Sequence, residues 1–526
     1  MEKIITPLTI VFYVLMLGYN AIKYRNELHK FQQNSYRNER YFKWLKHGNF
    51  WSGDRIVMFA VVFFVLAADF IGISLNLIFS LACASYVFIS VKLLKFKAKV
   101  PLKFTSRAKR LYFTSLAIVL IISFLLGYFV NPKFFLVSLP FGSFMSFIIL
   151  PFANILLKPV ENHINNWYIN DAKRILAEHP DLLIVGITGS YGKTSTKHFL
   201  HTILSQKYNV LMTPGSFNTT MGVVRTIREY LNPTHQVFIC EMGAKQINDI
   251  KEICDIVHPK IGILTSVAEQ HLDTFHNIEN VRKTKFELID SLPEDGMAIL
   301  NGDYEIIKNT PKSKTTQYYS TSDDSNDFSV KNITYSQHGT TFDLYHFKDK
   351  VETFSTELLG EYNISNIVAC IVCAYKLGLT TDSILYGVHK LQAVEHRMEI
   401  KPGPNGVVII DDAFNSNPKG AKMALDILSQ FTNCKRIVIT PGIIELADRQ
   451  DYYNGELGKQ IAKSADFAVL VGKEQTEAIY NGLKAENYPE EQIYIAKGLA
   501  DAANFAYSRA HAGDVILFEN DLPDYH

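Results

Sequence analysis

A glycine-rich turn at residues 186–195, Gly-Ile-Thr-Gly-Ser-Tyr-Gly-Lys-Thr-Ser, has the composition of a phosphate-binding loop. It follows a short apolar run at residues 182–185 and precedes a predicted helix over residues 195–204. A strand, a glycine-rich turn and a helix N-terminus together direct backbone N–H groups and the helix dipole at an anion. The side chain of Lys193 can reach the outer phosphates of a nucleoside triphosphate, and Thr194 can offer its hydroxyl to Mg²⁺. The residues predicted to hold the phosphates are Gly189, Ser190, Gly192, Lys193, Thr194 and Ser195.

The spacing of the glycines in this turn differs from that of the common P-loop. That loop has its first glycine five residues before Gly192, where this chain has Ile187. A glycine-rich turn that binds nothing is the alternative, but Gly-Lys-Thr at a strand-to-helix junction favours a phosphate site. We therefore expect the chain to bind and consume ATP together with Mg²⁺.

The region after the turn alternates between short apolar runs and helical patterns. Apolar runs at residues 237–240, 261–264 and 298–300 predict a doubly wound, mostly parallel α/β sheet. Ligands of such sheets bind at the carboxyl ends of the strands. Glu241 and Asn301 follow two of these runs directly, so both are candidate site residues.

The last third of the chain predicts a separate domain. Apolar runs alternate with helical patterns there as well, which is typical of a Rossmann-like α/β fold. Arg397 and Asp412 lie at the entrance to this domain. The apolar runs are residues 407–410, 436–439 and 468–471.

In combination and order these motifs resemble those of the Mur ligase family. The resemblance covers about residues 161–526, and the block at residues 411–418 is most similar to the MurF branch, which adds D-Ala-D-Ala. It implies an ATP-dependent carboxylate–amine ligase that acts through an acyl phosphate on a cell-envelope precursor. The other matching segments are residues 188–194, 214–222, 241–244, 265–272, Lys285 with Glu287, Asn301 with Asp303, residues 360–366, and Arg397 with Glu399.

The resemblance also implies roles for the polar residues near the strand ends. Thr194, Glu241 and His271 would hold Mg²⁺, and Lys285 matches a lysine that is carbamylated in several family members. The alternatives are a helix-capping carboxylate for Glu241, a surface position for His271, and an ion pair between Lys285 and Glu287. The residues implied to be catalytic are Lys193, Lys285, His271 and Arg397.

Nucleotide contacts are implied for four residues. Asn301 would read the adenine edge, Arg397 would contact the phosphates, and Asp412 would bind the ribose with Asn415 nearby. The alternative for each is a local structural role, such as a turn asparagine, a hinge ion pair or a cap. The loop at residues 440–446 either faces the incoming amine or is a plain turn.

The first 157 residues contain long uncharged stretches. Residues 4–22, 111–130 and 134–157 carry no charge, and residues 56–91 carry one, Asp69. A membrane-spanning helix needs about 20 apolar residues, so the stretch at residues 56–91 is long enough for two helices with a tight turn. The sequence thus predicts an α-helical membrane domain with about five spans, and buried helices of a soluble protein are the alternative.

The distribution of charge predicts the orientation of these helices. Residues 23–55 and residues 92–110 each carry eight Lys or Arg, and the positive-inside rule places both segments in the cytoplasm. Five spans then leave the N-terminus outside and the catalytic domains in the cytoplasm. We expect a multi-pass protein of the cell membrane whose basic loops contact membrane lipids, and the net charge of +1 gives no indication of nucleic-acid binding. The predicted domains are the membrane domain at 1–160, the central ATP-binding domain at 161–395 and the C-terminal domain at 396–526.

The predicted membrane helices stand where MurF has a soluble domain for its UDP-linked sugar peptide. We therefore expect a cell-envelope precursor as acceptor, lipid-linked or held at the inner membrane face, and an amino acid or dipeptide as the amine. A poly-γ-glutamate synthase-like ligase is one alternative, and a nucleotide-binding membrane scaffold without catalysis is another. The acidic segment at residues 518–524 differs from the Lys-Gly-Ser segment of MurF, which leaves the amine open.

Overall fold

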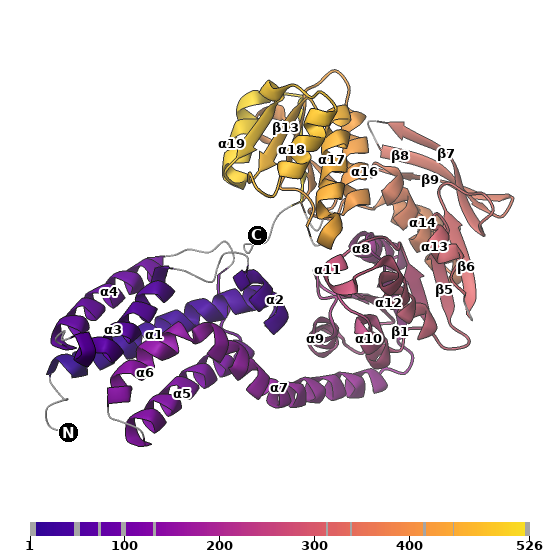
Figure 1. Ribbon diagram of the computed structural model, residues 1–526. Helices are drawn as coiled ribbons and strands as arrows, with labels where there is room; N and C mark the ends of the chain where they lie inside the picture. Colours follow the sequence, from indigo (N-terminus) through magenta and orange to yellow (C-terminus); the bar gives the residue numbers. More distant parts are fainter. Residues whose placement is uncertain are drawn as a thin grey trace. The chain divides into compact units, whose positions relative to one another are not determined.

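Figure 1 shows the computed structural model, which describes residues 7–46, 53–71, 75–95, 101–129, 133–311, 314–336, 339–413, 417–444 and 446–520. The chain forms two compact units, and the boundary between them lies between Asn166 and Trp167. The first unit is helical, and the second contains two sheets covered by helices. The predicted α/β architecture of the second unit is thereby confirmed.

Helices form at each of the predicted uncharged stretches of the first unit. Within the described part of the chain, one helix, α5, is long and apolar enough to cross a membrane by itself. The bent pair of α6 and α7 meets the same test when the two are taken as one. The structure therefore supports fewer spans than the five predicted. The helices are α1 (Pro7–Gln33), α2 (Asn38–Trp44), α3 (Gly53–Ile71), α4 (Leu75–Lys95), α5 (Ser106–Phe129), α6 (Lys133–Phe144) and α7 (Ser146–Ala177).

The candidate span at residues 134–157 is not one straight helix, because the chain bends by 78° between α6 and α7. Pro140 lies inside α6 and removes a helical hydrogen bond shortly before the bend. Gly142 packs so closely on α5 that an added Cβ would lie 2.6 Å from Cγ1 of Val119. Proline and glycine are common causes of helix kinks. Helix α7 then continues to Ala177, through the predicted domain boundary at residue 160.

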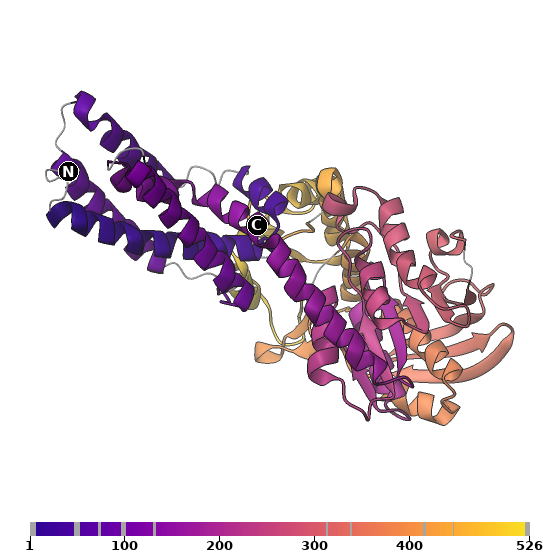
Figure 2. The same ribbon diagram turned by 90° about the horizontal axis from the view of Figure 1, so that it is seen from below.

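Charged side chains lie inside the helical unit, where they pair with one another. The carboxylate of Glu27 is fully buried and binds Lys23 at 3.0 Å, Arg55 at 3.2 Å and the hydroxyl of Tyr41 at 2.5 Å. Such partners offset the cost of removing a charge from water. These contacts join α1, α2 and α3, and α4 and α6 pack against α1 and α3. Figure 2 shows the long helices of this unit from a second side.

The central sheet has nine strands in the order β2-β3-β1-β4-β5-β6-β7-β8-β9. Strands β1 to β7 pair in parallel, as predicted, and β7, β8 and β9 form an antiparallel meander that the sequence pattern did not predict. The strands are β1 (Leu183–Thr188), β2 (Val210–Met212), β3 (Val237–Glu241), β4 (Ile261–Leu264), β5 (Met297–Asn301), β6 (Thr315–Ser320), β7 (Phe328–Ser336), β8 (Gly339–His346) and β9 (Asp349–Thr356).

Helices cover both faces of this sheet, as Figure 1 shows. Helices α8, α14 and α15 pack into the apolar core on one face, and α9, α10 and α12 pack into the core on the other. The helices are α8 (Lys193–Leu204), α9 (Thr220–Tyr230), α10 (Asp249–Val257), α11 (Leu272–Phe275), α12 (Ile278–Asp290), α13 (Glu305–Lys308), α14 (Glu361–Lys376) and α15 (Thr381–His389).

The second sheet has six strands in the order β10-β11-β15-β12-β13-β14 and is parallel except for β10. Helices α16, α17 and α18 pack on one face and α19 packs on the other. This is the predicted Rossmann-like arrangement. Its elements are β10 (Glu399–Pro402), β11 (Val408–Asp412), α16 (Pro418–Ser429), β12 (Arg436–Thr440), α17 (Gln450–Ser464), β13 (Phe467–Val471), α18 (Glu477–Ala485), β14 (Ile493–Ala496), α19 (Leu499–Arg509) and β15 (Val515–Glu519).

Candidate nucleotide and metal site

The glycine-rich turn lies between β1 and α8, as a phosphate-binding loop requires. Gly192 has a left-handed φ of 85°, and an added Cβ would lie 2.5 Å from Oδ1 of Asn366. An added Cβ on Gly189 would lie 2.0 Å from Oγ1 of Thr265. Both positions therefore need glycine, because any side chain would meet a neighbouring element.

The segment after β4 holds this turn in place. The backbone N–H of Ser190 donates to the carbonyl of Ser266 at 3.0 Å, and that of Tyr191 donates to the Ser266 hydroxyl at 2.9 Å. The N–H of Ala268 donates to the Ser190 hydroxyl at 2.9 Å. The loop is thus fixed before any ligand binds, which reduces the entropy lost on binding.

Lys193 is half-buried at the start of α8 and bends back over the loop. Its amine donates to the carbonyl of Gly189 at 2.7 Å and to that of Ser190 at 3.3 Å. Burial lowers the pKa of Lys193 to about 8, Glu241 opposes this shift, and the charge of Arg397 adds to it. A phosphate placed in the loop would add negative charge beside this ammonium and oppose the lowering of its pKa.

Thr194 and Glu241 meet where β1 and β3 end. The Thr194 hydroxyl donates to Oε1 of Glu241 at 3.2 Å, and the Asn218 amide donates to the same oxygen at 3.0 Å. Burial alone would raise the pKa of Glu241, but the ammonium groups of Lys197 and Lys193 outweigh it and lower that pKa. An ionised carboxylate beside a threonine hydroxyl is an oxygen donor set that suits Mg²⁺.

His271 follows the segment that holds the phosphate loop. It is half-buried and precedes α11 with a left-handed φ of 51°, which is uncommon for a residue with a side chain. Two residues earlier, Glu269 binds Arg449 at 2.5 Å and the hydroxyl of Tyr453 at 2.5 Å. These contacts join the predicted metal-binding segment to the C-terminal domain, and a metal contact of His271 itself stays a prediction.

Lys285 is 1% exposed on α12, which excludes a solvated surface lysine. Its pKa is lowered well below the ordinary range, first by burial and then by the charge of Lys193. Glu287, the alternative ion-pair partner, uses its carboxylate to accept the backbone N–H groups of Asn248 at 2.7 Å and Lys251 at 2.9 Å. Glu287 thus caps α10, and Lys285 lies beside the phosphate loop with a weakly basic amine.

Asn301 lies at the end of β5 with its amide engaged by the protein. It donates to the carbonyl of Thr265 at 2.9 Å and to the hydroxyl of Ser365 at 3.1 Å, and its Oδ1 accepts the N–H of Asp303 at 3.0 Å. These are the bonds of the alternative, a turn asparagine, and the predicted adenine contact stays a prediction.

Three tyrosines beside the phosphate loop were not predicted as site residues. Tyr191 hydrogen-bonds to Tyr304 through the two hydroxyls, and the ring of Tyr362 lies 5.9 Å from that of Tyr191. Lys419 of α16 donates to the Tyr304 hydroxyl at 2.8 Å and lies 4.1 Å from the centre of its ring. The position of Tyr191 inside the loop, Gly-Ser-Tyr-Gly, was the available sequence signal.

Arg397 and Asp412 lie together at the entrance to the C-terminal domain. Burial raises the pKa of Asp412 to about 6, although the nearby charge of Arg397 and the N–H of Met398 oppose this shift. Arg397 also influences Lys193 electrostatically, so the structure brings it to the phosphate loop. Residues on both sides of Arg397 have left-handed φ angles, 58° at His396 and 52° at Met398. Asn415 lies outside the described residues.

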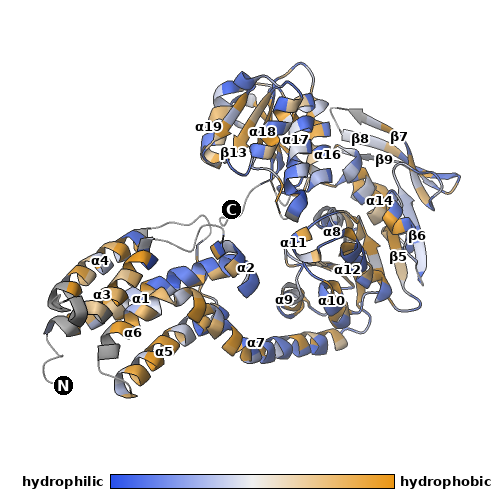
Figure 3. Ribbon diagram, in the orientation of Figure 1, coloured by the Kyte–Doolittle hydropathy of each residue, from blue (hydrophilic) through white to orange (hydrophobic). Residues whose placement is uncertain are grey.

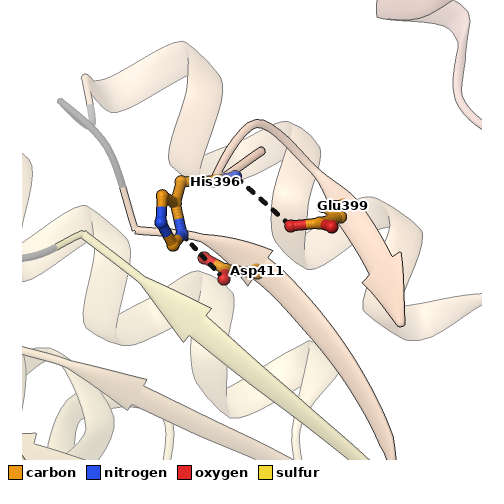
Figure 4. Close-up of side chains that lie close together, drawn as sticks. All are labelled: His396, Glu399 and Asp411. Atoms are coloured by element: carbon orange, nitrogen blue, oxygen red, sulfur yellow. Dashed lines mark hydrogen bonds and ion pairs between the residues drawn. The ribbon is translucent and has the colours of Figure 1, made fainter. Parts of the chain in front are cut away.

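A cluster of potential metal ligands next to this entrance already forms ion pairs with a lysine. In the described ranges, His396, Glu399 and Asp411 are the group of three that could share a metal ion (Figure 4). His396 Nδ1 lies 2.8 Å from Asp411, but the ammonium of Lys401 lies 2.6 Å from Asp411 and 3.2 Å from Glu399. The cluster is thus an ion-paired contact between β10 and β11.

The loop at residues 440–446 contributes to a pocket in the C-terminal domain. Ile443 of this loop lines the pocket together with two tyrosines of α17. Ile443 is also buried in the core and its backbone pairs with Asn454, so both interpretations of the loop, a surface for the incoming amine and a plain turn, stay open. The full lining is Pro418, Ile443, Tyr452, Tyr453, Glu456, Leu457 and Gln460.

Two family profiles and several curated relatives match this part of the chain. The profile of the Mur ligase middle domain matches residues 187–374, and that of the Mur ligase glutamate ligase domain matches residues 396–519. The UDP-N-acetylmuramoyl-tripeptide–D-alanyl-D-alanine ligase of Bacillus subtilis (strain 168) is 27% identical over 338 residues, 64% of this chain and 72% of that enzyme. The enzyme of the same name from Escherichia coli (strain K12) is 31% identical over 301 residues, 56% of this chain and 66% of that enzyme.

Solved structures match over the same region. The MurF ligase of Thermotoga maritima in complex with ADP superposes with a TM-score of 0.60 at 25% sequence identity, covering 68% of this chain and 80% of that one. MurF from Acinetobacter baumannii gives a TM-score of 0.61 at 23% identity and supports the fold alone. The chain spans about two thirds of the length of the curated relatives it matches, and both profile matches begin after residue 186.

Proposed function

Because this chain belongs to the Mur ligase family of ATP-dependent ligases, we propose that it joins an amine to a carboxylate of a peptidoglycan precursor in the manner of MurF. The observation that carries this proposal is the meeting of Lys193, Thr194 and Glu241 at the ends of two adjacent parallel strands. This arrangement suits a triphosphate and its metal ion. ATP and Mg²⁺ are the cofactors of the family, and they are the cofactors predicted from the sequence.

The reaction that this site suits has two steps. A carboxylate oxygen of the acceptor attacks the γ-phosphorus of ATP, the bond to the bridging oxygen breaks, and ADP leaves behind an acyl phosphate. The amine then attacks the acyl carbon, phosphate departs with the electrons of the C–O bond, and the nitrogen loses a proton. Phosphoryl transfer depends mainly on positioning and on neutralising charge.

The chain's own residues are arranged for these tasks. Backbone N–H groups of the loop and the ammonium of Lys193 would hold the outer phosphates, and Arg397 would approach them from the C-terminal domain. Thr194 and Glu241 would hold Mg²⁺, with His271 as a third ligand, and the ion would neutralise phosphate charge when bound. Lys285, buried beside Lys193, has the weakly basic amine that carbamylation requires.

A direct assay tests this function. Full-length protein in detergent would be supplied with ATP, Mg²⁺, UDP-N-acetylmuramoyl-tripeptide as acceptor and D-Ala-D-Ala or single amino acids as amine. We expect phosphate release and a ligated product, detected by mass spectrometry, that depend on both substrates. Nucleotide binding without phosphate release for every acceptor and amine tested would contradict the proposal and favour a nucleotide-binding scaffold.

We further propose that the helical unit anchors the enzyme in the cell membrane, with the catalytic domains in the cytoplasm. Helix α5 exposes large apolar side chains along much of its length, including Phe113, Ile121 and Phe124, which are 64%, 57% and 56% exposed. Figure 3 shows hydrophobic residues along this helix and its neighbours. A soluble monomer rarely exposes so continuous an apolar surface, whereas lipid would cover it.

Cysteine labelling tests the orientation of this anchor. Lys46 lies in the basic segment at residues 23–55, which the positive-inside rule assigns to the cytoplasm. A Lys46→Cys variant, in a background without the native cysteines, should react with an impermeant maleimide only after the cells are opened. Labelling of Cys at this position in intact cells would refute the orientation.

We propose, on the same ground, that the acceptor is held at the inner face of the membrane. Anchoring the ligase beside a membrane-bound acceptor raises the effective concentration of the two to roughly the millimolar range for short tethers. A chain that begins near Glu161 should then retain ATP binding and lose most ligation of the native acceptor. Equal ligation of a soluble UDP-linked acceptor by this shortened chain and by the full-length enzyme would contradict the proposal.

A further inference from the structure

Lys197 is a completely buried lysine on the helix that follows the phosphate loop. It lies four residues, or about one helical turn, after Lys193, and its side chain is 0% exposed. Lysine is almost never buried in this way unless its charge is paired. Burying this side chain therefore costs considerable desolvation free energy. The groups that contact Lys197 indicate what its side chain does.

The ammonium of Lys197 has two partners, and one of them is the predicted metal-binding carboxylate. It lies 3.0 Å from Oε2 of Glu241 and donates to the carbonyl of Gly215 at 2.6 Å. The other carboxylate oxygen, Oε1, accepts the hydroxyl of Thr194 at 3.2 Å and the amide of Asn218 at 3.0 Å. Oε1 thus accepts hydrogen bonds, one of them from the second predicted metal ligand, whereas Oε2 accepts no hydrogen bond from the described residues and is held by its ion pair with Lys197.

The loop at residues 213–218 is built around this carboxylate. The N–H of Glu241 donates to the Thr213 hydroxyl at 3.2 Å, and the N–H of Gly243 donates to the carbonyl of Asn218 at 2.7 Å. An added Cβ on Gly243 would lie 2.8 Å from Cγ of Asn218. The tip of the loop, at Gly215, is exposed, so Lys197 connects a surface loop to the buried end of β3.

We propose that Lys197 is a positioning residue for the ligase reaction. It fixes Oε2 of Glu241, so that Oε1 is presented beside Thr194 as a single Mg²⁺ ligand, and it ties this carboxylate to the loop at residues 213–218. The inference rests on the proposed function, because it takes Glu241 as a ligand of the metal. Mg²⁺ requires a nearly octahedral arrangement with few protein oxygens, and residues that orient a metal ligand commonly change metal affinity by 10–100-fold.

The sign of the effect separates this role from a purely electrostatic one. An ammonium next to a metal site repels the metal, so removal of its charge alone would tighten metal binding. Removal of a group that orients Glu241 would weaken metal binding instead. A lysine that only stabilises the fold would change the unfolding temperature and leave the metal affinity of the folded protein unchanged.

The experiment uses full-length protein in detergent with Mn²⁺ and the non-hydrolysable nucleotide AMP-PNP as probes. Free Mn²⁺ is measured by its electron paramagnetic resonance signal, and AMP-PNP binding is measured separately in EDTA. We expect Lys197→Met to raise the Mn²⁺ dissociation constant about 10–100-fold, with AMP-PNP binding in EDTA within about twofold of wild type. Lys207→Met is the matched control, because Lys207 is an exposed lysine just beyond the same helix.

Lys197→Gln is the second variant, because it keeps a hydrogen-bond donor and is tolerated more easily at a buried position. We expect it to weaken Mn²⁺ binding about tenfold, the lower end of the range for residues that orient metal ligands. Unchanged or tighter Mn²⁺ binding in either variant, if folded, would overturn the inference. Neither assay needs the acceptor, so a wild type that binds Mn²⁺ and AMP-PNP but ligates nothing would contradict the proposed function alone.

Discussion

The helical unit buries an ion-paired cluster of charges and exposes many large apolar side chains, whereas the large apolar side chains of the second unit lie mainly in its cores. Glu27, Lys23 and Arg55 are buried between the helices, and most of the exposed large apolar side chains in the described residues belong to this first unit. The two sheets of the second unit are instead surrounded by apolar cores. This difference is the one that the proposed membrane anchor requires.

The second unit also buries some charged side chains within its apolar cores. Three of its buried charged residues, Lys197, Glu241 and Lys285, lie near the phosphate loop, and others, such as Asp343 on β8, are buried elsewhere. Buried groups with strongly shifted pKa values, such as Lys285, are common at functional sites. Substitutions of the same chemical kind should therefore have different effects in the two units, and the following predictions test that difference from the largest expected effect to the smallest.

The largest effect is expected for Lys193→Ala. The variant loses the ammonium that the loop directs toward the phosphates, so ATP turnover should fall by about 10²–10³-fold or more, as when a charge-stabilising donor is lost. Circular dichroism should show an unchanged fold. Lys207→Ala is the control for removal of a lysine from the same domain. Equal ATP consumption by folded wild type and Lys193→Ala would exclude this residue from the reaction.

Glu241→Gln and His271→Ala test the metal site. Gln keeps the shape of the Glu241 side chain and removes its charge, and Ala removes the imidazole. Each variant should raise the Mg²⁺ concentration needed for half-maximal turnover by about 10–100-fold, the range for loss of a group that supports a bound metal. Mg²⁺ titrations that match the wild type in both variants would exclude these ligand roles.

Ile121→Lys tests the solvent of the helical unit. Ile121 is 57% exposed on α5, and a lysine at the centre of a membrane helix costs about 2.5–3.5 kcal/mol. We expect less protein in the membrane fraction and a lower unfolding temperature. Ile247→Lys is the matched control, because Ile247 is 44% exposed in the second unit and should tolerate lysine within about 0.5 kcal/mol. If the two variants behave alike, α5 faces water.

Much of the second unit could be predicted from its sequence because each element carries a local signal. The strands at 237–241, 261–264 and 297–301 were visible as apolar runs, and the polar residues after them lie at the strand ends as expected. Tertiary contacts leave no such signal. That Glu287 caps α10 rather than pairs with Lys285 depends on how two helices pack.

The features that were missed have the same explanation. Lys197 is four residues after Lys193, but nothing in that spacing shows that a strand end and a loop would enclose it. The antiparallel strands β7 to β9 are 9, 8 and 8 residues long, but they are rich in polar residues and only partly buried, so no apolar run marks them in the sequence. In the helical unit, hydropathy predicted where helices form, and it did not reveal the bend between α6 and α7, which lies close to Pro140 and Gly142.

The smallest effect is expected for Asp412→Asn, which should raise the free energy of unfolding and weaken nucleotide binding. Burial raises the pKa of Asp412 to about 6, above the ordinary aspartate value of about 3.9. Between these two pH values the folded state binds a proton that the unfolded state has lost, so the free energy of unfolding falls as pH rises through about 4 to 6 and stays lower above it. Asparagine has no charge to bury and removes this loss.

We therefore expect Asp412→Asn to be more stable than wild type by about 1–2 kcal/mol at pH 7, with the gain disappearing near pH 4. The expected gain in the free energy of unfolding is smaller than the full pKa shift would give, because the variant also loses the favourable interaction with the charge of Arg397. AMP-PNP binding should weaken at the same time if Asp412 contacts the ribose. Unfolding midpoints measured from pH 4 to 8 check the first effect, and calorimetric titration checks the second. Parallel pH profiles for the two proteins would show that the Asp412 carboxylate has no effect on stability. The idea that this charge is retained for ligand binding, at a cost to the stability of the fold, would then be wrong.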